Sequence, residues 1–205
     1  GQSLEKALLA VQKSPGATIR IRGTCVGNFV LSTDRIRLEG VTEERAVLRA
    51  PNATDMSTVL TIQDASDVQV RRLHVQHGGQ SGVGLRFETS HRGLVYDCEF
   101  DQNEVGLVFR WSDDGSVWDC SMHDNEAGLV SSFRSSVSAQ RSSFRNNTDV
   151  GLLAFVNSDL NVGDSEVTGN GSGGVGAQIH SSLGLAQVVL RENGESHIFA
   201  TDRSK

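Results

Sequence analysis

Short runs of alternating apolar and polar residues recur along most of the chain. In the run from 85 to 88, Leu85 and Phe87 are apolar, whereas Arg86 and Glu88 are charged. Alternation with a period of two is typical of a β-strand with one buried and one exposed face. The repeated units show almost no apolar spacing of helical type. The pattern therefore predicts many short strands joined by turns.

The alternating runs belong to a sequence repeat that is marked by a tripeptide with a central glycine. Successive glycines are 22, 22, 23 and 25 residues apart in Val83-Gly84-Leu85, Val105-Gly106-Leu107, Ala127-Gly128-Leu129, Val150-Gly151-Leu152 and Val175-Gly176-Ala177. An asparagine column keeps the same phase, at Asn103, Asn125, Asn147, Asn170 and Asn193. Two further columns are Val95, Val117, Ala139, Val162 and Leu185, and Cys98, Cys120, Ser142, Ser165 and Val188. Residues of one column should occupy equivalent places in successive coils.

The length of the repeat limits the possible folds. Leucine-rich repeats have a similar period, but they need an LxxLxLxxN core that this chain lacks. We therefore predict an all-β fold, a right-handed parallel β-helix solenoid of about seven or eight coils. Equivalent strands should stack about 4.8 Å apart in parallel sheets, and the asparagines should form a side-chain ladder at a turn.

The first sixteen residues differ from the repeats. Leu4, Ala7, Leu8 and Val11 have helical spacing, Ser3 is a suitable N-cap, and Pro15-Gly16 ends the helix. We expect this helix to cap the first coil, because an open solenoid end exposes core residues and strand edges.

The remaining sequence is consistent with a single domain over residues 1–205. We divide it into the capping helix (1–16), irregular early coils (17–80), regular coils of 22–25 residues (81–195) and a C-terminal end (196–205). The early strands are expected at Thr18–Ile21, Phe29–Leu31, Ile36–Leu38 and Val59–Ile62. Residues 41–57 are expected to form a longer excursion between coils.

Composition narrows the possible partners. The net charge is −6 with scattered charges, and there is no Lys/Arg run, so nucleic acid is not expected as a partner. No apolar stretch approaches the 18 residues of a membrane span. The three cysteines form neither a disulfide framework nor a zinc motif. We expect Cys98 and Cys120 to be buried thiols in adjacent coils.

Two units, GLRFETSHRGLVYDCEFDQNE and GLVFRWSDDGSVWDCSMHDNE, resemble the repeats of pectate-lyase-like right-handed β-helix proteins. The opening GATIRIRGTCVGNFVLSTDRIRLEG resembles the start of exported bacterial members. The resemblance implies a carbohydrate-related function and an extracytoplasmic location (periplasmic, secreted or at the cell surface). The family includes lyases, epimerases, hydrolases and tailspikes, so it does not define one reaction.

Candidate catalytic residues are sparse. Asp113 and Asp114 are the one adjacent carboxylate pair in the repeats, with Arg110 nearby, but Asp114-Gly115 also has the composition of a turn. Galacturonase-like members carry Gly-His-Gly and Arg-Ile-Lys motifs, and this chain has neither. The six histidines show no HxH or HExxH spacing, so they are expected at the surface.

One column combines opposite charges and contains Arg72, Asp97, Asp119, Arg141 and Asp164. A Ca²⁺ ion between Asp97 and Asp119 is one interpretation, and no other cofactor is expected. An alternating ladder of stacked charges is the interpretation that we prefer, because adjacent carboxylates repel each other unless they are compensated.

Outward positions supply the candidate binding residues. Tyr96 and Trp118 should stack on adjacent coils, and these two residues and Trp111 are candidate sugar contacts. A second outward set, Val108, Val130, Leu153 and Phe155, should form an apolar patch that suits contact between two copies of the chain.

We therefore favour an exported β-helix module for binding or assembly, related to carbohydrate and without a catalytic signature. The alternative is a small polysaccharide lyase, uronate epimerase or glycoside hydrolase.

Overall fold

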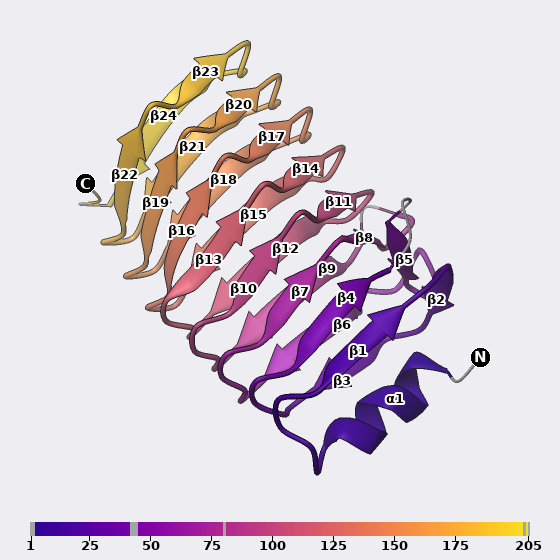
Figure 1. The fold of residues 1–205 in the computed structure, drawn as a ribbon. Helices are drawn as coiled ribbons and strands as arrows, with labels where there is room; N and C mark the ends of the chain where they lie inside the picture. The colour runs from indigo at the N-terminus through magenta and orange to yellow at the C-terminus, as the bar shows by residue number, and fades with distance from the viewer. Residues whose placement is uncertain (1–2, 42–44, 80, 203, 205) are drawn as a thin grey trace.

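The computed structural model describes residues 3–41, 45–79, 81–202 and 204. Eight coils stack along one axis, and each contributes one strand to each of three parallel sheets (Figure 1). The predicted parallel β-helix solenoid is thereby confirmed.

Sheet A holds the first strand of each coil: β1 (Thr18–Ile21), β4 (Arg37–Gly40), β7 (Gln69–Arg71), β10 (Leu94–Tyr96), β13 (Gly115–Trp118), β16 (Ser136–Gln140), β19 (Asp159–Gly163) and β22 (Ser182–Ala186). Sheet B holds the second strands: β2 (Thr24–Val26), β5 (Ala46–Arg49), β8 (Leu73–Gln76), β11 (Glu99–Asp101), β14 (Ser121–His123), β17 (Ser143–Arg145), β20 (Glu166–Thr168) and β23 (Val189–Arg191). Sheet C holds the third strands: β3 (Phe29–Leu31), β6 (Thr58–Gln63), β9 (Val83–Glu88), β12 (Val105–Arg110), β15 (Ala127–Ser132), β18 (Val150–Phe155), β21 (Gly173–Gln178) and β24 (Ser196–Thr201).

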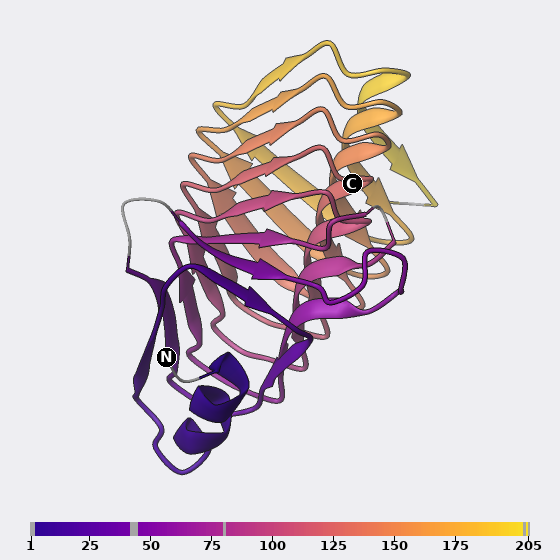
Figure 2. The same ribbon diagram turned by 90° about the vertical axis from the view of Figure 1, so that its right-hand side faces the viewer.

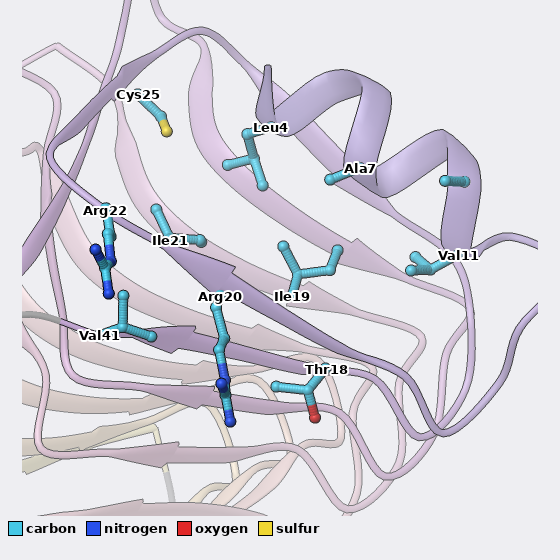
Figure 3. Close-up of a pocket in the computed structure, with 11 residues that line it drawn as sticks. Leu4, Ala7, Val11, Thr18, Ile19, Arg20, Ile21, Arg22, Cys25 and Val41 are labelled. Carbon is cyan, nitrogen blue, oxygen red and sulfur yellow. The ribbon is translucent and has the colours of Figure 1, made fainter. Parts of the chain in front are cut away.

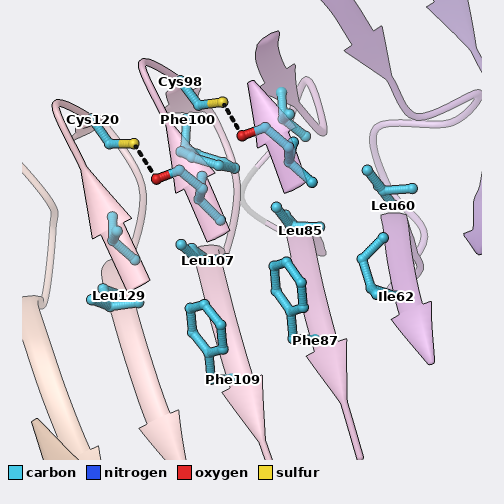
Figure 4. Close-up of a cluster of buried hydrophobic side chains, with 14 of the residues drawn as sticks. Leu60, Ile62, Leu85, Phe87, Cys98, Phe100, Leu107, Phe109, Cys120 and Leu129 are labelled. Atoms are coloured by element: carbon cyan, nitrogen blue, oxygen red, sulfur yellow. Dashed lines mark hydrogen bonds between the residues drawn. The ribbon is translucent and has the colours of Figure 1, made fainter. Parts of the chain in front are cut away.

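The core is built from inward columns that run through all three sheets. In sheet A, Val95, Val117 and Ala139 stack in register and are fully buried, as the repeat predicts. In sheet C, Phe87 and Phe109 stack face to face with their ring centroids 4.8 Å apart (Figure 4). Because each inward side chain lies against equivalent residues above and below, the sequence columns become continuous apolar stacks.

Polar ladders occupy the corners between sheets. At the B–C corner, the side-chain oxygen of each asparagine accepts bonds from the preceding coil, as between Asn125 Oδ1 and both nitrogens of Asn103. At the C–A corner, a serine ladder that the sequence analysis missed links Ser90, Ser112, Ser135, Ser158 and Ser181 through N–H to Oγ bonds. These ladders satisfy backbone groups that the sheets leave unpaired at each bend.

The cysteine column fills the A–B corner with small side chains. Cys98 and Cys120 are buried free thiols, and their Sγ atoms donate to the carbonyl oxygens of Val70 and Val95 (Figure 4). One coil further, Ser142 Oγ accepts from the Cys120 N–H at 3.2 Å. Cysteine and serine therefore serve the same corner as small hydrogen-bonding side chains.

The helix α1 (Leu4–Val11) lies across the first coil (Figure 2). Its N-cap is Ser3, whose side chain accepts from the Lys6 N–H, as expected. Leu4 and Leu8 are buried against the coil. The helix thus covers the N-terminal end of the core.

Two details of the predicted organisation are wrong. Residues 41–57 are not a simple excursion, because they include β5, which pairs with β2 and β8 in sheet B. In the seventh coil, Gly174 and not Gly176 continues the glycine column, because Val175 pairs with Leu152 and Gly176 with Leu153. Val175-Gly176-Ala177 matches the tripeptide pattern but is out of register with it. Position 174 is the one that requires glycine, because a side chain there would collide with the next coil.

Candidate functional site

The outer face of sheet A carries a groove of about 420 Å³ that spans the third to fifth coils. Its floor is formed by side chains and backbone of Gln69, Gly93, Leu94, Ser116 and Trp118. These residues come from outward positions of β7, β10 and β13 and from the turn before β10. Leu94 and Ser116 occupy stacked positions and are both smaller than Trp118, so the indole ring lies beside a hollow.

The wall of the groove comes from the turns that lead into sheet A. Arg92 donates from Nε and Nη2 to the two carboxylate oxygens of Asp67, at 2.6 and 2.8 Å. This bidentate pair holds the pKa of the Asp67 carboxyl below its usual range. Asp114 completes the wall, and it makes no ion pair within the described residues. The groove therefore combines an aromatic ring, a fixed guanidinium and an unpaired carboxylate.

An aromatic and arginine strip continues the site across sheet A. Tyr96 and Trp118 occupy paired positions on adjacent strands, as predicted. The Arg71 guanidinium lies 5.6 Å from the Tyr96 ring centroid, and that of Arg141 lies 4.7 Å from the Trp118 centroid. Arg141 also donates two bonds of 2.8 Å to Asp119 and so lowers the pKa of that carboxyl, helped by a bond from Tyr96. These contacts fix the orientation of both rings.

The predicted charge ladder is only partly formed. Arg141 and Asp119 pair, but Asp97 pairs with Arg45, and Arg72 pairs with Glu39. Long arginine side chains reach across coils, so the partners are not always column neighbours. Within residues 3–41, 45–79, 81–202 and 204, no group of three or more His, Cys, Asp or Glu side chains is arranged to hold a metal ion.

The other weak catalytic candidates do not meet at the groove. Asp113 lies 3.6 Å from the His91 imidazole. Arg110 projects from sheet C, where its guanidinium lies 4.0 Å from the ring centroid of Trp111. The structure thus joins Asp114 with Trp118, but it places Asp113, Arg110 and Trp111 outside that site.

The apolar patch on sheet C is less exposed than its sequence suggests. Val108, Val130 and Leu153 share an outward column, but Val108 is only 9% exposed and the other two are half-buried, as is Phe155. Each apolar side chain covers its stacked neighbours, which reduces the exposed area.

A second apolar column, at the corner after sheet C, was missed. It contains Trp111, Phe133, Val156 and Ile179, all with left-handed backbone at φ of 49–55°. The rings of Trp111 and Phe133 lie 5.3 Å apart, and Phe155 meets Phe133 edge-on at 6.0 Å. The spacing of 22 or 23 residues could have revealed this column.

Histidines on sheet B are more organised than expected. His74 Nε2 lies 2.6 Å from Asp101 Oδ1, and His123 Nε2 lies 3.0 Å from Glu99 Oε1. These are diagonal pairs across three successive coils, so column spacing did not show them. The Asp101 hydrogen bond raises the pKa of His74.

His77 also contradicts the expectation of surface histidines, because its side chain is fully buried. It takes the asparagine position in the third coil, where its N–H donates to Asn103 Oδ1 at 2.8 Å. Its Nε2 lies 3.1 Å from Asp55 Oδ1. His77 therefore forms the N-terminal end of the asparagine ladder.

A larger cavity, of about 590 Å³, lies between α1 and the first coil (Figure 3). Its lining is mainly apolar and includes Leu4, Val11, Ile19 and Ile21, with Cys25 at one side. Burial raises the pKa of the Cys25 thiol. None of the predicted site residues lines this cavity.

In the part of the chain that the structure describes, no helix has both the length and the apolar character that crossing a membrane requires.

Comparison with known proteins agrees with this architecture. The chain is 13% identical to the enzymatically active domain of bacteriophage CBA120 tailspike protein 2, with a TM-score of 0.65, over 100% of this chain and 41% of that one. It is 14% identical to the A-module of an Azotobacter vinelandii mannuronan C-5 epimerase, with a TM-score of 0.59, over 94% and 73% of the two chains. Against a pectin methylesterase of Erwinia chrysanthemi, the identity is 12%, the TM-score 0.59 and the coverage 97% and 76%.

At such low identity, these similarities concern the fold. No curated protein sequence matches the chain. The sequence model of the right-handed β-helix region family matches residues 41–197, more than half of the chain. With the three parallel sheets and the asparagine ladder, this match shows that the chain belongs to the right-handed β-helix family.

Proposed function

We propose that the protein binds a polysaccharide in the groove on the outer face of sheet A. The observation that carries the proposal is the presence of Trp118, Arg92 and Asp114 around one hollow. An aromatic face packs against the apolar face of a sugar ring, while charged and polar groups bond its hydroxyls. Tyr96 and Arg141 extend this surface to neighbouring positions.

The architecture suits a long ligand more than a small one. The floor is shared by adjacent strands of a parallel sheet, so equivalent positions repeat at about 4.8 Å along the axis. Three structures of similar fold are carbohydrate-related by their names, the mannuronan epimerase and two pectin methylesterases. A polysaccharide ligand also agrees with the extracytoplasmic location that we propose for this chain.

Catalysis is a second candidate function, and a single feature favours it. The Asp114 carboxylate lines the groove beside the Arg92 guanidinium. A carboxylate next to a bound sugar can act as a general acid or base. However, Arg92 is already paired with Asp67, so among the described residues that line the groove Asp114 is the one carboxylate without an ion pair. We therefore place binding before lyase, epimerase or hydrolase activity.

The proposal is tested by affinity electrophoresis of the pure protein in gels that contain neutral or acidic polysaccharides. We expect retardation by at least one of them, and Trp118→Ala should weaken binding about tenfold, the loss expected for one stacked ring. Trp111→Ala is the matched control, because Trp111 is exposed on another face and should leave binding unchanged. Equal effects of the two variants, or no retardation by any polysaccharide, would reject the groove as the binding site.

The same polysaccharides then separate binding from catalysis. Incubation followed by detection of new reducing ends, unsaturated uronate ends or altered uronate composition reports hydrolase, lyase and epimerase activity. We expect none of these products. Activity that Asp114→Asn abolishes while gel retardation persists would establish the catalytic alternative. Repeating both assays with Ca²⁺ and with a chelator tests whether an ion takes part.

A further inference from the structure

The middle of the outer face of sheet C is apolar on three successive coils. The outward column of the apolar patch pairs in register on β12, β15 and β18, and it consists of Val108, Val130 and Leu153. A second stacked column, at the start of the same strands, consists of Val105, Ala127 and Val150. Each of these coils has a described coil on both sides. The apolar character therefore belongs to mid-solenoid and not to an end of the stack.

One edge of this face is acidic. Glu104, Glu126 and Asp149 directly precede the first residues of β12, β15 and β18, and the Asp149 N–H donates to the Glu126 carbonyl oxygen at 2.9 Å. Glu126 and Asp149 are exposed, and Glu104 is half-buried. Within the described residues, none of the three carboxylates takes part in an ion pair. Stacked like charges repel each other, so this edge favours a partner that supplies cations.

The opposite edge of the face is basic. Arg110 is the last residue of β12, and Arg134 lies two residues after the end of β15. Arg134 is exposed and makes no ion pair in the part of the chain that the structure describes. The Arg110 guanidinium lies 4.0 Å from the Trp111 ring centroid and 5.0 Å from that of Phe133, and it reaches Glu88 only at 3.7 Å. Both guanidinium groups therefore keep donors for a further carboxylate.

We infer that the outer face of sheet C binds the same face of a second copy of the chain. Along the strand direction, the face presents an acidic edge, an apolar middle and a basic edge. A partner must present the reverse order, and a copy turned by a two-fold rotation does so. The apolar middle supplies the buried area, while the charged edges set the orientation of the two copies.

The charges select one of the two possible two-fold axes in the plane of the interface. An axis along the strands would keep the strand direction and set one acidic edge against the other. An axis along the solenoid reverses the strands, so each coil faces its own equivalent. Glu104 then faces Arg110 of the other copy, and Glu126 faces Arg134. Symmetry supplies each of these charge pairs twice.

This arrangement packs two sheets face to face, as in a β-sandwich, at a distance of about 10 Å. The outward column meets its own equivalents across the axis: Val108, Val130 and Leu153. The groove lies on sheet A, so it is outside the interface on both copies. The inference does not depend on what the groove binds.

The experiment is light scattering after size exclusion, performed on the 205-residue chain at micromolar concentration. Twice the chain mass is expected for the wild type. Glu126→Arg should give the monomer mass, because like charges then meet across the interface. The double reversal Glu126→Arg/Arg134→Glu should restore the dimer. Arg145→Glu is the matched control, since Arg145 is an exposed arginine on sheet B, and this variant should remain a dimer.

Circular dichroism of each variant checks that it is folded. Leu153→Asp/Phe155→Ser, which places a charge in the apolar middle, should also give the monomer mass. A monomeric wild type overturns the inference, and so does a dimer that survives both Glu126→Arg and the change at Leu153 and Phe155. A dimer that is lost with Leu153→Asp/Phe155→Ser but survives Glu126→Arg, or a double reversal that stays monomeric, contradicts the charge pairing and with it the proposed axis.

Discussion

At the residue scale, the positions with the strictest side-chain requirements lie at the corners between the sheets. The Asn125 side chain donates to the carbonyl oxygens of Phe100 and His123 and to Asn147 Oδ1, at 3.0–3.1 Å. Its oxygen accepts from both nitrogens of Asn103. The repeat predicted the ladder, but it could not show how many bonds one buried amide makes. That number follows from the close stacking of the coils.

We expect Asn125→Ala to lower the free energy of unfolding by about 3 kcal/mol or more, because several buried groups lose their partner at about 1–3 kcal/mol each. Phe144→Ala, which removes a fully buried ring, should lower it by about 3–5 kcal/mol. Urea titration of both variants checks this, with Asn161→Ala as the exposed control. A loss near zero for Asn125→Ala would mean that the ladder adds no stability.

The His74 pair makes stability depend on pH. Its pKa is raised by the Asp101 hydrogen bond and by the charges of Asp101 and Glu99, against burial and the charge of Arg45. The protonated form is therefore favoured by folding. This contribution is fully present below the ordinary histidine pKa of about 6.5 and is lost as the pH rises through the raised value in the folded protein.

We accordingly expect His74→Gln to destabilise the protein near pH 6 and to have little effect near about pH 9. Unfolding curves of wild type and variant at the two pH values measure the difference. His180→Gln, at an exposed histidine, is the control. A loss of stability that is equal at both pH values would show that the pair does not act through its proton.

At the scale of elements, sequence columns predicted the strands well where every coil has the same length. The columns gave wrong predictions where the number of residues per coil changes. β5 was hidden in a segment without the tripeptide, and Gly176 imitated the glycine that Gly174 provides. The groove was not predicted, although its wall residues Asp67, Arg92 and Asp114 share a column. Each lies two positions before the paired residues Gln69, Leu94 and Ser116 and has left-handed backbone. The column was overlooked because its residue type changes between acid and base from coil to coil.

The apolar column at the corner after sheet C has strained backbone, and the strain can be tested. Val156 adopts φ of 54°, a left-handed conformation that is unfavourable for a β-branched residue by about 1–2 kcal/mol. Asparagine tolerates this conformation, so Val156→Asn should leave stability unchanged or raise it by up to about 1 kcal/mol. The buried Val162→Asn, in contrast, should be strongly destabilising. Denaturant titration measures the free energy of unfolding of both variants. A comparable loss of stability in the two would show that packing of the Val156 side chain outweighs its backbone strain.

At the scale of the whole molecule, each strand is hydrogen-bonded only to strands of the adjacent coils, so stability should be distributed along the axis mainly in nearest-neighbour steps. In the part of the chain that the structure describes, the coil of β22–β24 has a neighbouring coil on one side only, and its core residues are less buried than those of the coil before it. Hydrogen exchange of the 205-residue chain should therefore be fastest for the amides of this coil. The solenoid architecture was predictable from the repeat, and the N-terminal helix was predictable from the helical spacing of residues 4–11.

The constant register of the fourth and fifth coils has a consequence for how such a protein can change in length. Residues 107–128 make one full circuit, because Leu107 pairs with Leu129, the residue that directly follows the segment. A tandem duplication of this segment would add one coil, and its inward columns and corner ladders would match those of the coils on either side. The gene could thus grow or shrink by whole circuits without redesign of any contact.

We expect the duplicated chain to fold cooperatively, with a larger denaturant dependence of unfolding because more surface is buried. Inserting only residues 107–117, half a circuit, should abolish the cooperative transition, since every following column would face the wrong sheet. Circular dichroism and urea titration compare the two. A half-circuit insertion that is tolerated as well as the full one would mean that the coils are held together by something other than their register.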